Sequence, residues 1–281
     1  MLAFVGDSLG RQQLQSLMCM ITHGKNKTLI NEVGSEFGFY TPHGARKPTG
    51  YAYRFMETNT TIVFVWTTTL ALVEPLNKSD PATRNALHID RPERFIKDHL
   101  PQLDVLILNS GHHWNGGKMK LNKYDFYYGG KPVGKGEPLS NVYNAYNMSI
   151  HSVVSWLSKE IAGTDKQVFY RSLSPRHFRN GDWNSGGTCD SIRFDKEVKV
   201  QEGDPTDPRA ESAIRGTNVK LLNITSLSLE RGETHISKYN GGKNGQDCLH
   251  WCLPGIPDTW NEVLFAMLSP PIFRQKVAGA A

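Results

Sequence analysis

Short apolar runs that alternate with helical segments constrain the fold of this chain more than any other feature of its sequence. Leu2–Val5, Thr61–Trp66 and Leu103–Gly111 have strand length, and the last is a continuous apolar run that ends in polar residues and a glycine. Further strand-like runs begin at Gln167 and Val219. Such alternation indicates an open, mostly parallel sheet with helices on both faces, so we expect an α/β protein.

Helices and loops are expected between these runs. Apolar residues at helical spacing predict a helix that begins near Gly10 or Arg11: Leu14, Leu17, Met18 and Ile21. A second helix is expected around Ser149–Ile161. The stretch Trp114–Glu137 is rich in Gly, Lys and Tyr, which predicts a long surface loop, and Ser174–Asp190 has a similar loop-like composition.

The size of the chain is compatible with one large core. Its 281 residues contain 38% hydrophobic residues and show no repeat or low-complexity linker, so we expect one domain over residues 1–269. Residues 270–281 lack apolar periodicity and are expected to form a disordered tail. The apolar opening is short, lacks a charged region and a cleavage site, and no apolar run has the length of a membrane helix. The sequence therefore predicts neither a membrane span nor a signal peptide.

Charge and cysteine usage narrow the possible partners. The net charge is +5, but Lys and Arg are scattered, which argues against a nucleic-acid partner and leaves an acidic polymer possible. The four cysteines fit no zinc spacing, so no metal site is expected. Asn-X-Ser/Thr acceptors indicate a glycosylating compartment, with coincidence as the alternative: Asn26, Asn59, Asn77, Asn147 and Asn223.

A small-residue turn, Gly6-Asp7-Ser8-Leu9, follows the first apolar run. A serine there lies at the carboxyl end of a strand, where ligands bind in such sheets, but it needs a base and a group that orients the base. His250 is the best candidate of the ten histidines, because Asp247-X-X-His250 spacing lets the carboxylate accept from Nδ1 within a tight turn or a first helical turn. The structural alternatives are a helix N-cap for Ser8 and an ordinary packed histidine for His250.

Segments spread along most of the chain resemble the plant trichome birefringence-like family, also called the PC-esterase group of polysaccharide O-acetyltransferases. They are FVGDSLGRQQ, LNSGHHW, RSLSPRHFRNGDWNSGGTC and DCLHWCLPGIPDTWNE. The resemblance implies the GDSL/SGNH superfamily, with a three-layer α/β/α sandwich around a mostly parallel central sheet. It also implies a Ser-His-Asp triad, residence in the Golgi lumen as a type II membrane protein, and acetylation of cell-wall polysaccharide.

The resemblance assigns the triad to Ser8, Asp247 and His250, with an acetyl-serine intermediate on Ser8. Candidate donors for the oxyanion are then the Ser8 main-chain N–H and Asn109. His113 is an alternative donor, since the superfamily's Gly-X-Asn-Asp block is not literally present in NSGHHW. No bound cofactor is expected, and the acetyl donor is a co-substrate for which acetyl-CoA is a candidate.

Several residues are candidates for contact with substrate. Arg11 follows Ser8 by one helical turn and would orient Asp7 or meet substrate, with a solvated helix arginine as the alternative. The loop residues that would line a sugar groove are Arg176, His177, Asp182, Trp183 and Asn184. Packing for purely structural reasons is the alternative for each of them. The same ambiguity applies to His112, Trp114 and Trp251.

The resemblance also assigns the cysteines. Cys189 and Cys248 match a pair that is bridged in the family, whereas Cys19 and Cys252 match cysteines whose partners lie in an N-terminal subdomain upstream of Gly-Asp-Ser. That subdomain is expected in a full-length form. The expected acceptor is a wall polysaccharide, with a xylan-like polymer first. The rival hypotheses are a carbohydrate esterase with the same triad and a wall-polysaccharide binding protein without turnover.

Overall fold

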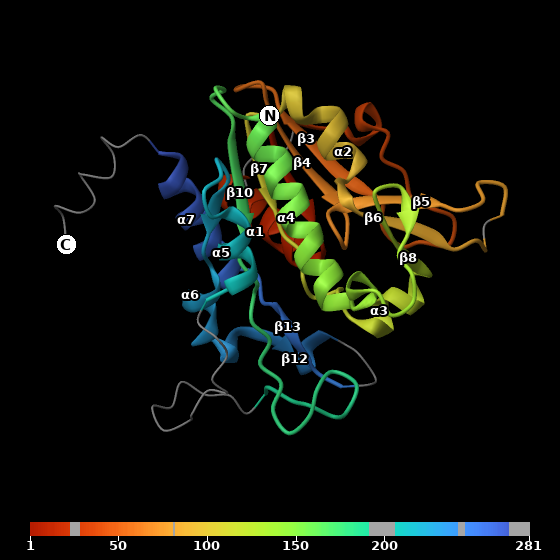
Figure 1. Ribbon diagram of the computed structural model, residues 1–281. Helices are drawn as coiled ribbons and strands as arrows, with labels where there is room; N and C mark the ends of the chain where they lie inside the picture. Colours follow the sequence, from red (N-terminus) through yellow and green to blue (C-terminus); the bar gives the residue numbers. More distant parts are fainter. Residues whose placement is uncertain (23–28, 81, 191–205, 241–244, 270–281) are drawn as a thin grey trace. The chain divides into compact units, whose positions relative to one another are not determined.

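The computed structural model describes residues 1–22, 29–80, 82–190, 206–240 and 245–269 (Figure 1). The chain divides into two compact units. Unit 1 contains Met1–Arg11, Lys27–Leu173 and Asp207–Leu221, and unit 2 contains Gln12–Asn26, Ser174–Thr206 and Leu222–Ala281. The single domain over residues 1–269 stays a prediction, and the expected tail over 270–281 lies outside the described residues.

A seven-stranded sheet forms the centre of the fold, in the order β11-β10-β7-β1-β4-β3-β2. Its strands are β1 (Leu2–Gly6), β2 (Ile30–Glu32), β3 (Gly50–Phe55), β4 (Thr60–Trp66), β7 (Val105–Leu108), β10 (Gln167–Arg171) and β11 (Lys220–Leu222). β1 pairs in parallel with β4 and β7, and β7 pairs in parallel with β10. Only β3 and β2, at one edge, run antiparallel to their neighbours among the described pairings. The prediction of a mostly parallel sheet is therefore confirmed.

Helices alternate with these strands along the described part of the chain, as the predicted α/β fold requires. They are α1 (Ser8–Thr22), α2 (Arg94–His99), α3 (Gly116–Leu121), α4 (Val142–Glu160), α5 (Pro208–Ile214), α6 (Thr225–Leu229) and α7 (Ile256–Leu268). In unit 1, α4 runs across the sheet and contacts α5 (Figure 1). Apolar side chains from the inner strands and from α4 pack together in one core, which includes Val5, Val63, Leu106 and Val153.

The strand predictions hold, but helix boundaries shift. α1 begins at Ser8 rather than near Gly10. α4 begins at Val142 rather than near Ser149, because the side chain of Asn141 accepts hydrogen bonds from Tyr143 N and Asn144 N and caps the helix. Caps of this kind depend on a few local atoms, so apolar periodicity alone places the body of a helix better than its start.

The expected long loop over Trp114–Glu137 is wrong. This stretch contains α3, β8 (Tyr124–Tyr128) and β9 (Lys131–Pro132). A four-stranded sheet in unit 1 has the order β5-β6-β8-β9, with β5 at Ala71–Pro75 and β6 at Asn85–Pro92. The aromatic segment YDFYY pairs with β6 in parallel register, and this partner outweighs the surrounding Gly and Lys residues that favour a loop.

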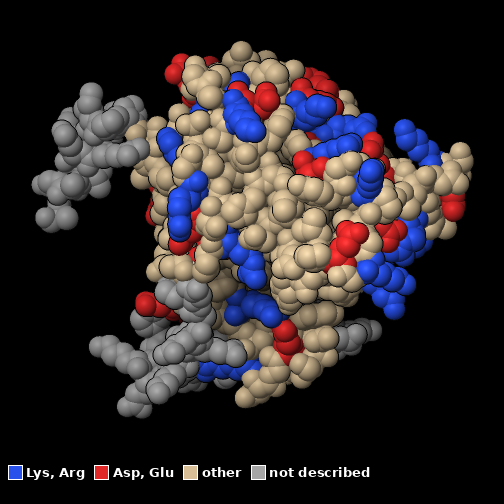
Figure 2. Space-filling view, viewed as in Figure 1, with Lys and Arg blue, Asp and Glu red and all other residues tan. Residues whose placement is uncertain are grey.

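Unit 2 contains a small antiparallel sheet of β12 (His235–Ser237) and β13 (Asp247–Trp251). Among the residues that the structure describes, none of the helices combines the length and apolar character needed to cross a bilayer. On the face in Figure 2, basic and acidic side chains are interspersed, as their scatter along the sequence suggests.

Candidate active site

The turn between β1 and α1 holds Ser8 at the first position of a helix. The Asp7 side chain caps the helix, because its Oδ1 accepts from Leu9 N at 3.0 Å, and its main-chain oxygen accepts from Arg11 N at 3.1 Å. The cap is therefore Asp7 rather than Ser8. Ser8 itself is half-buried at the carboxyl end of a central strand.

Asn109, which directly follows the neighbouring strand β7, holds this turn through a hydrogen bond. Its side chain is buried, and its Nδ2 donates to Asp7 Oδ1 at 2.6 Å. A Cβ atom at Gly6 would lie 2.0 Å from Asn109 Oδ1, and one at Gly10 would lie 2.2 Å from the same atom. Both glycines are therefore needed for the close approach of Asn109. The oxyanion role of Asn109 stays a prediction, and this amide already has a positioning role.

A buried arginine lies behind the turn. Arg171, at the end of β10, is 2% exposed and donates from a guanidinium nitrogen to Leu9 O at 3.1 Å. Burial lowers the pKa of Arg171 to about 10, while the charge of the Asp7 carboxylate acts in the opposite direction. Asp7 is only 1% exposed, and the charge of this buried carboxylate acts on the buried guanidinium of Arg171. Sequence reasoning missed Arg171, although a cation at the end of the apolar run QVFYR was a signal.

Replacement of Arg171 by methionine is expected to destabilise the protein by about 3–5 kcal/mol, because the buried Asp7 carboxylate loses its counter-charge. Urea unfolding measures this loss. The control is Arg84→Met, which removes a surface pair with Asp125 and should cost about 0–1 kcal/mol. Adding Asp7→Asn to Arg171→Met should restore part of the stability. An unchanged urea midpoint for Arg171→Met would show that the charge of Arg171 does not stabilise the buried Asp7 carboxylate.

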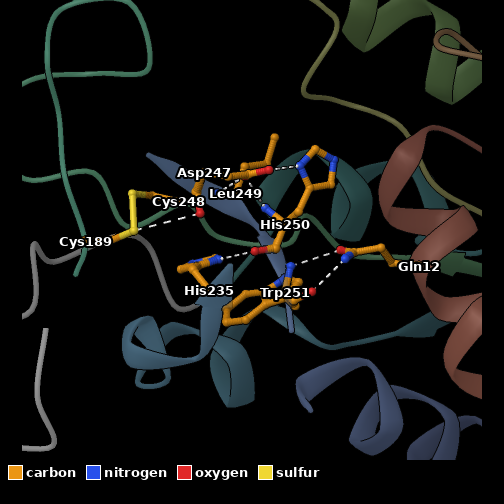
Figure 3. A network of polar contacts seen from close by, with 8 residues as sticks. All are labelled: Gln12, Cys189, His235, Asp247, Cys248, Leu249, His250 and Trp251. Atoms are coloured by element: carbon orange, nitrogen blue, oxygen red, sulfur yellow. Dashed lines mark hydrogen bonds and ion pairs between the residues drawn. A yellow bond between two sulfur atoms is a disulfide. The ribbon is translucent and has the colours of Figure 1, made fainter. Parts of the chain in front are cut away.

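The acid–base pair lies in unit 2, on β13. His250 Nδ1 donates to Asp247 Oδ2 at 2.8 Å, so the predicted hydrogen bond is present (Figure 3). Burial alone raises the pKa of the Asp247 carboxyl, but hydrogen bonds from the ring and main chain of His250 outweigh burial and hold this pKa well below its usual range. The carboxylate is therefore ionised at neutral pH and fixes the tautomer that leaves His250 Nε2 as acceptor.

The pair stands on β13 rather than in a helical turn, and the predicted tight turn is formed by the Asp247 side chain. Asp247 Oδ1 accepts from Leu249 N at 3.2 Å and from His250 N at 2.9 Å. These side-chain bonds to the main chain curl the start of β13 back on itself, as in an Asx-turn. The curl brings together two residues that regular strand geometry would separate.

Trp251 anchors the strand beside His250. It is fully buried and stacks on His235 with ring centroids 3.9 Å apart. Gln12 Nε2 donates to Trp251 O at 2.7 Å, and Trp251 N donates to Gln12 Oε1 at 3.0 Å (Figure 3). Both main-chain groups of Trp251 are thus satisfied by one amide. Trp251 is a packing residue, and so is Trp114, which is buried against Tyr146.

The predicted sugar-contacting loop separates into an exposed and a buried part. Arg176 and Asp182 form a surface ion pair at 3.1 Å, whereas Trp183 is 63% exposed and Asn184 is exposed. His177 is buried instead. Its Nδ1 lies 2.7 Å from Nε2 of His235, and its Nε2 lies 2.7 Å from Leu229 O. The side chain of His177 is thus held within the interior of unit 2.

Stability is expected to fall as pH drops from 7 to 5. Burial lowers the pKa of His177, and it lowers that of His235 to about 3, below the ordinary 6.5. The unfolded chain then binds protons that the folded unit excludes, which costs up to about 1.4 kcal/mol per pH unit for each such group. In urea unfolding, His235→Gln should make the free energy of unfolding depend less on pH. His43→Gln, at an exposed position, should leave this pH dependence unchanged. Equal slopes for His235→Gln and the unmodified chain would contradict the expectation.

Cys189 and Cys248 form a disulfide with a Cα–Cα distance of 5.8 Å, the pairing that the family resemblance implies (Figure 3). It ties the Gly-rich loop to the residue that follows Asp247. Cys19 and Cys252 carry free, exposed thiols. In the described ranges, no His, Cys, Asp and Glu side chains gather as a metal centre requires.

The site residues are distributed over both units. Ser8, Arg11, Asn109 and His113 belong to unit 1, and Asp247 and His250 belong to unit 2, as does the loop from Arg176 to Asn184. The pairing of Ser8 with His250 stays a prediction.

Comparisons with known proteins identify the family. The model of the GDSL/SGNH-like acyl-esterase family found in Pmr5 and Cas1p matches residues 1–267. Protein trichome birefringence-like 14 of Arabidopsis thaliana is 44% identical over 284 residues, which cover 95% of this chain and 69% of that protein. Trichome birefringence-like 15 of the same plant is 43% identical over 279 residues, with 95% and 56% covered. Xyloglucan O-acetyltransferase 1, also from A. thaliana, is 30% identical over 288 residues, with 95% and 64% covered. The chain therefore spans 56–69% of the length of these relatives and belongs to the GDSL/SGNH-like acyl-esterase family.

Proposed function

We propose that this protein is an O-acetyltransferase that acetylates hydroxyl groups of a plant cell-wall polysaccharide. The hydrogen-bonded pair of Asp247 and His250 carries the proposal, because it is the oriented base that a serine nucleophile needs. Ser8 supplies the nucleophile from the turn between a strand and a helix. Membership of an acyl-esterase family supports acyl chemistry. The relative named as a xyloglucan O-acetyltransferase supports transfer to a polysaccharide.

In the first half-reaction, Ser8 Oγ attacks the acetyl carbonyl carbon of the donor while His250 Nε2 accepts the hydroxyl proton. The bond between the acetyl carbon and the leaving atom breaks, and His250 gives the proton to that atom. In the second half-reaction, a sugar hydroxyl attacks the acetyl-serine ester. His250 takes its proton and returns it to Ser8 as the ester bond breaks. Asp247 stabilises the imidazolium in both halves.

The finer assignments belong to the same proposal. The acceptor is a wall polymer, for which a xylan-like chain is the first candidate, and acetyl-CoA is a candidate donor. The Ser8 main-chain N–H, with Asn109 or His113, would stabilise the oxyanion. The proposed compartment is the Golgi lumen. The proposed full-length form has an upstream subdomain whose cysteines would pair with Cys19 and Cys252.

A carbohydrate esterase with the same residues is the second candidate, since the matching family is described as acyl-esterases. The two differ in whether a sugar hydroxyl or water reaches the acetyl-enzyme. In the hydrolytic case, a deacetylated sugar and free acetate are the products.

Product analysis separates these functions. The protein is incubated with p-nitrophenyl acetate or acetyl-CoA and a panel of xylan, mannan, xyloglucan and pectin oligomers, and mass spectrometry follows the products. Acetylated oligomer above a no-protein control supports the transferase. Free acetate released in a parallel incubation with acetylated xylan, with no transfer in the first, supports the esterase. Tight polysaccharide binding with neither product would overturn the proposal in favour of a binding protein.

A further inference from the structure

An exposed tryptophan lies at the sheet edge that carries Ser8. Trp66 is the last residue of β4 and is the register partner of Gly6, the last residue of β1. Thr67 N then donates to Gly6 O at 2.8 Å, so the end of β4 stays joined to the turn that leads into Ser8. Trp66 is 38% exposed, whereas the five strand residues directly before it, Thr61 to Val65, are buried. An indole in this position presents an apolar surface next to the candidate nucleophile.

The ring of Trp66 extends over the carboxyl end of β1. In the sheet, β1 lies between β4 and β7. His113 follows β7 in the chain, yet its ring lies edge-on to Trp66 with centroids 6.0 Å apart. The contact between these rings therefore crosses the end of β1, where the turn to Ser8 is located. Sequence reasoning missed Trp66, because it was counted only as part of an apolar strand.

Arg11 adds a cation to the same place. It is on α1, one turn after Ser8 and thus on the same side of the helix, and its guanidinium carbon lies 5.3 Å from the centroid of the Trp66 ring. In the described part of the chain, no carboxylate forms a salt bridge with Arg11 or with the nearby Lys47. The positive charge of Arg11 lowers the pKa of Lys47, as expected of cations that share no counter-ion.

An aromatic face beside uncompensated cations suits a sugar ring that carries a carboxylate. The apolar face of a pyranose packs on an indole, and a guanidinium binds a carboxylate through charge-assisted hydrogen bonds. We propose that Trp66 and Arg11 form a subsite for a uronic acid unit of the acceptor polymer, beside Ser8. This assignment rests on the proposed function, which it deepens by naming an acidic sugar.

Binding to two matched oligomers tests the subsite without turnover. Calorimetry in the Ser8→Ala background compares an oligogalacturonide with its methyl ester, which has the same rings but no carboxylate charge. We expect the acid to bind about tenfold more tightly than the ester at low salt, with the ratio shrinking as salt rises. Arg11→Gln should reduce the ratio to about 1, and Arg11→Lys should restore part of it. Trp66→Ala should weaken both ligands by about fivefold or more.

The controls are Tyr128→Ala, which removes another exposed aromatic ring of unit 1, and Arg94→Gln, which removes another exposed cation. Neither should change the affinities or their ratio. Equal binding of acid and ester by the unmodified chain, or an unchanged ratio in Arg11→Gln, would overturn the subsite. A loss of CoA binding in Trp66→Ala without loss of oligomer binding would assign this surface to the donor instead. Because the measurement needs no acetyl transfer, failure of the proposed function and failure of the subsite give different results.

Discussion

Replacement of Ser8 by alanine is expected to abolish the acetyl-enzyme adduct and to lower acetyl transfer by about 10⁴-fold or more. The expected loss is large because no other group at the turn can form the ester. The hydrogen bonds of Asp7, Asn109 and Arg171 hold the turn and do not involve the Ser8 hydroxyl, so the variant keeps them. Mass spectrometry of the protein after incubation with p-nitrophenyl acetate detects the adduct, and product analysis gives the rate.

The matched control is Ser35→Ala, which removes an exposed hydroxyl elsewhere in unit 1. This variant should keep both the adduct and the rate. A stoichiometric acetyl adduct that survives in Ser8→Ala would exclude Ser8 as the nucleophile. Unfolding by urea at the same midpoint for Ser8→Ala and the unmodified chain would show that the loss is chemical rather than structural.

Replacement of Asp247 by asparagine is expected to lower the rate by roughly 10⁴-fold while the protein stays folded. The Asp247 carboxylate accepts from His250 Nδ1 and so places the proton of the neutral ring on Nδ1, which leaves Nε2 as the base. An asparagine amide can donate to Nδ1 instead, which places the proton on Nε2 and removes the base. The effect should appear mainly in kcat rather than in the KM for the acceptor, because Asp247 acts on the imidazole and not on the sugar.

Asp190→Asn is the control for this variant, since Asp190 is an exposed carboxylate next to Cys189 in the same unit. It should change neither kcat nor KM. A kcat in Asp247→Asn within about tenfold of the unmodified chain would mean that His250 does not depend on this carboxylate for its tautomer.

The sequence alone was a good guide where a structure depends on neighbours in the chain. The strands β1, β4 and β10 are apolar runs whose pattern is complete within a few residues, and the structure contains them at almost the predicted bounds. The bond between Asp247 and His250 is likewise local, although it forms on a strand rather than in a helical turn. The disulfide between Cys189 and Cys248 came from the family resemblance and not from local pattern.

The start of α4 and the loop around β8 show where local pattern was insufficient. β8 forms because β6 pairs with it. The composition of this stretch, rich in Gly and Lys, does not indicate that a pairing strand is present elsewhere in the chain. His177 is a related case, since its loop sequence suggested a surface residue. Contact with His235 and Leu229 places it inside unit 2.

What the sequence by itself determined was the α/β class, the strand-to-helix turn at Ser8 and the Asp247–His250 spacing, because each depends on interactions within a few residues. Only the tertiary structure decided which distant side chains surround the turn. Arg171 donates a hydrogen bond to Leu9, 162 positions away in the chain. The Trp66 ring contacts the guanidinium of Arg11 and the ring of His113. These contacts follow from the strand order, which places β4 and β7 beside β1 and places β10 beyond β7. Strand order arises from packing of the whole core rather than from any local run of residues.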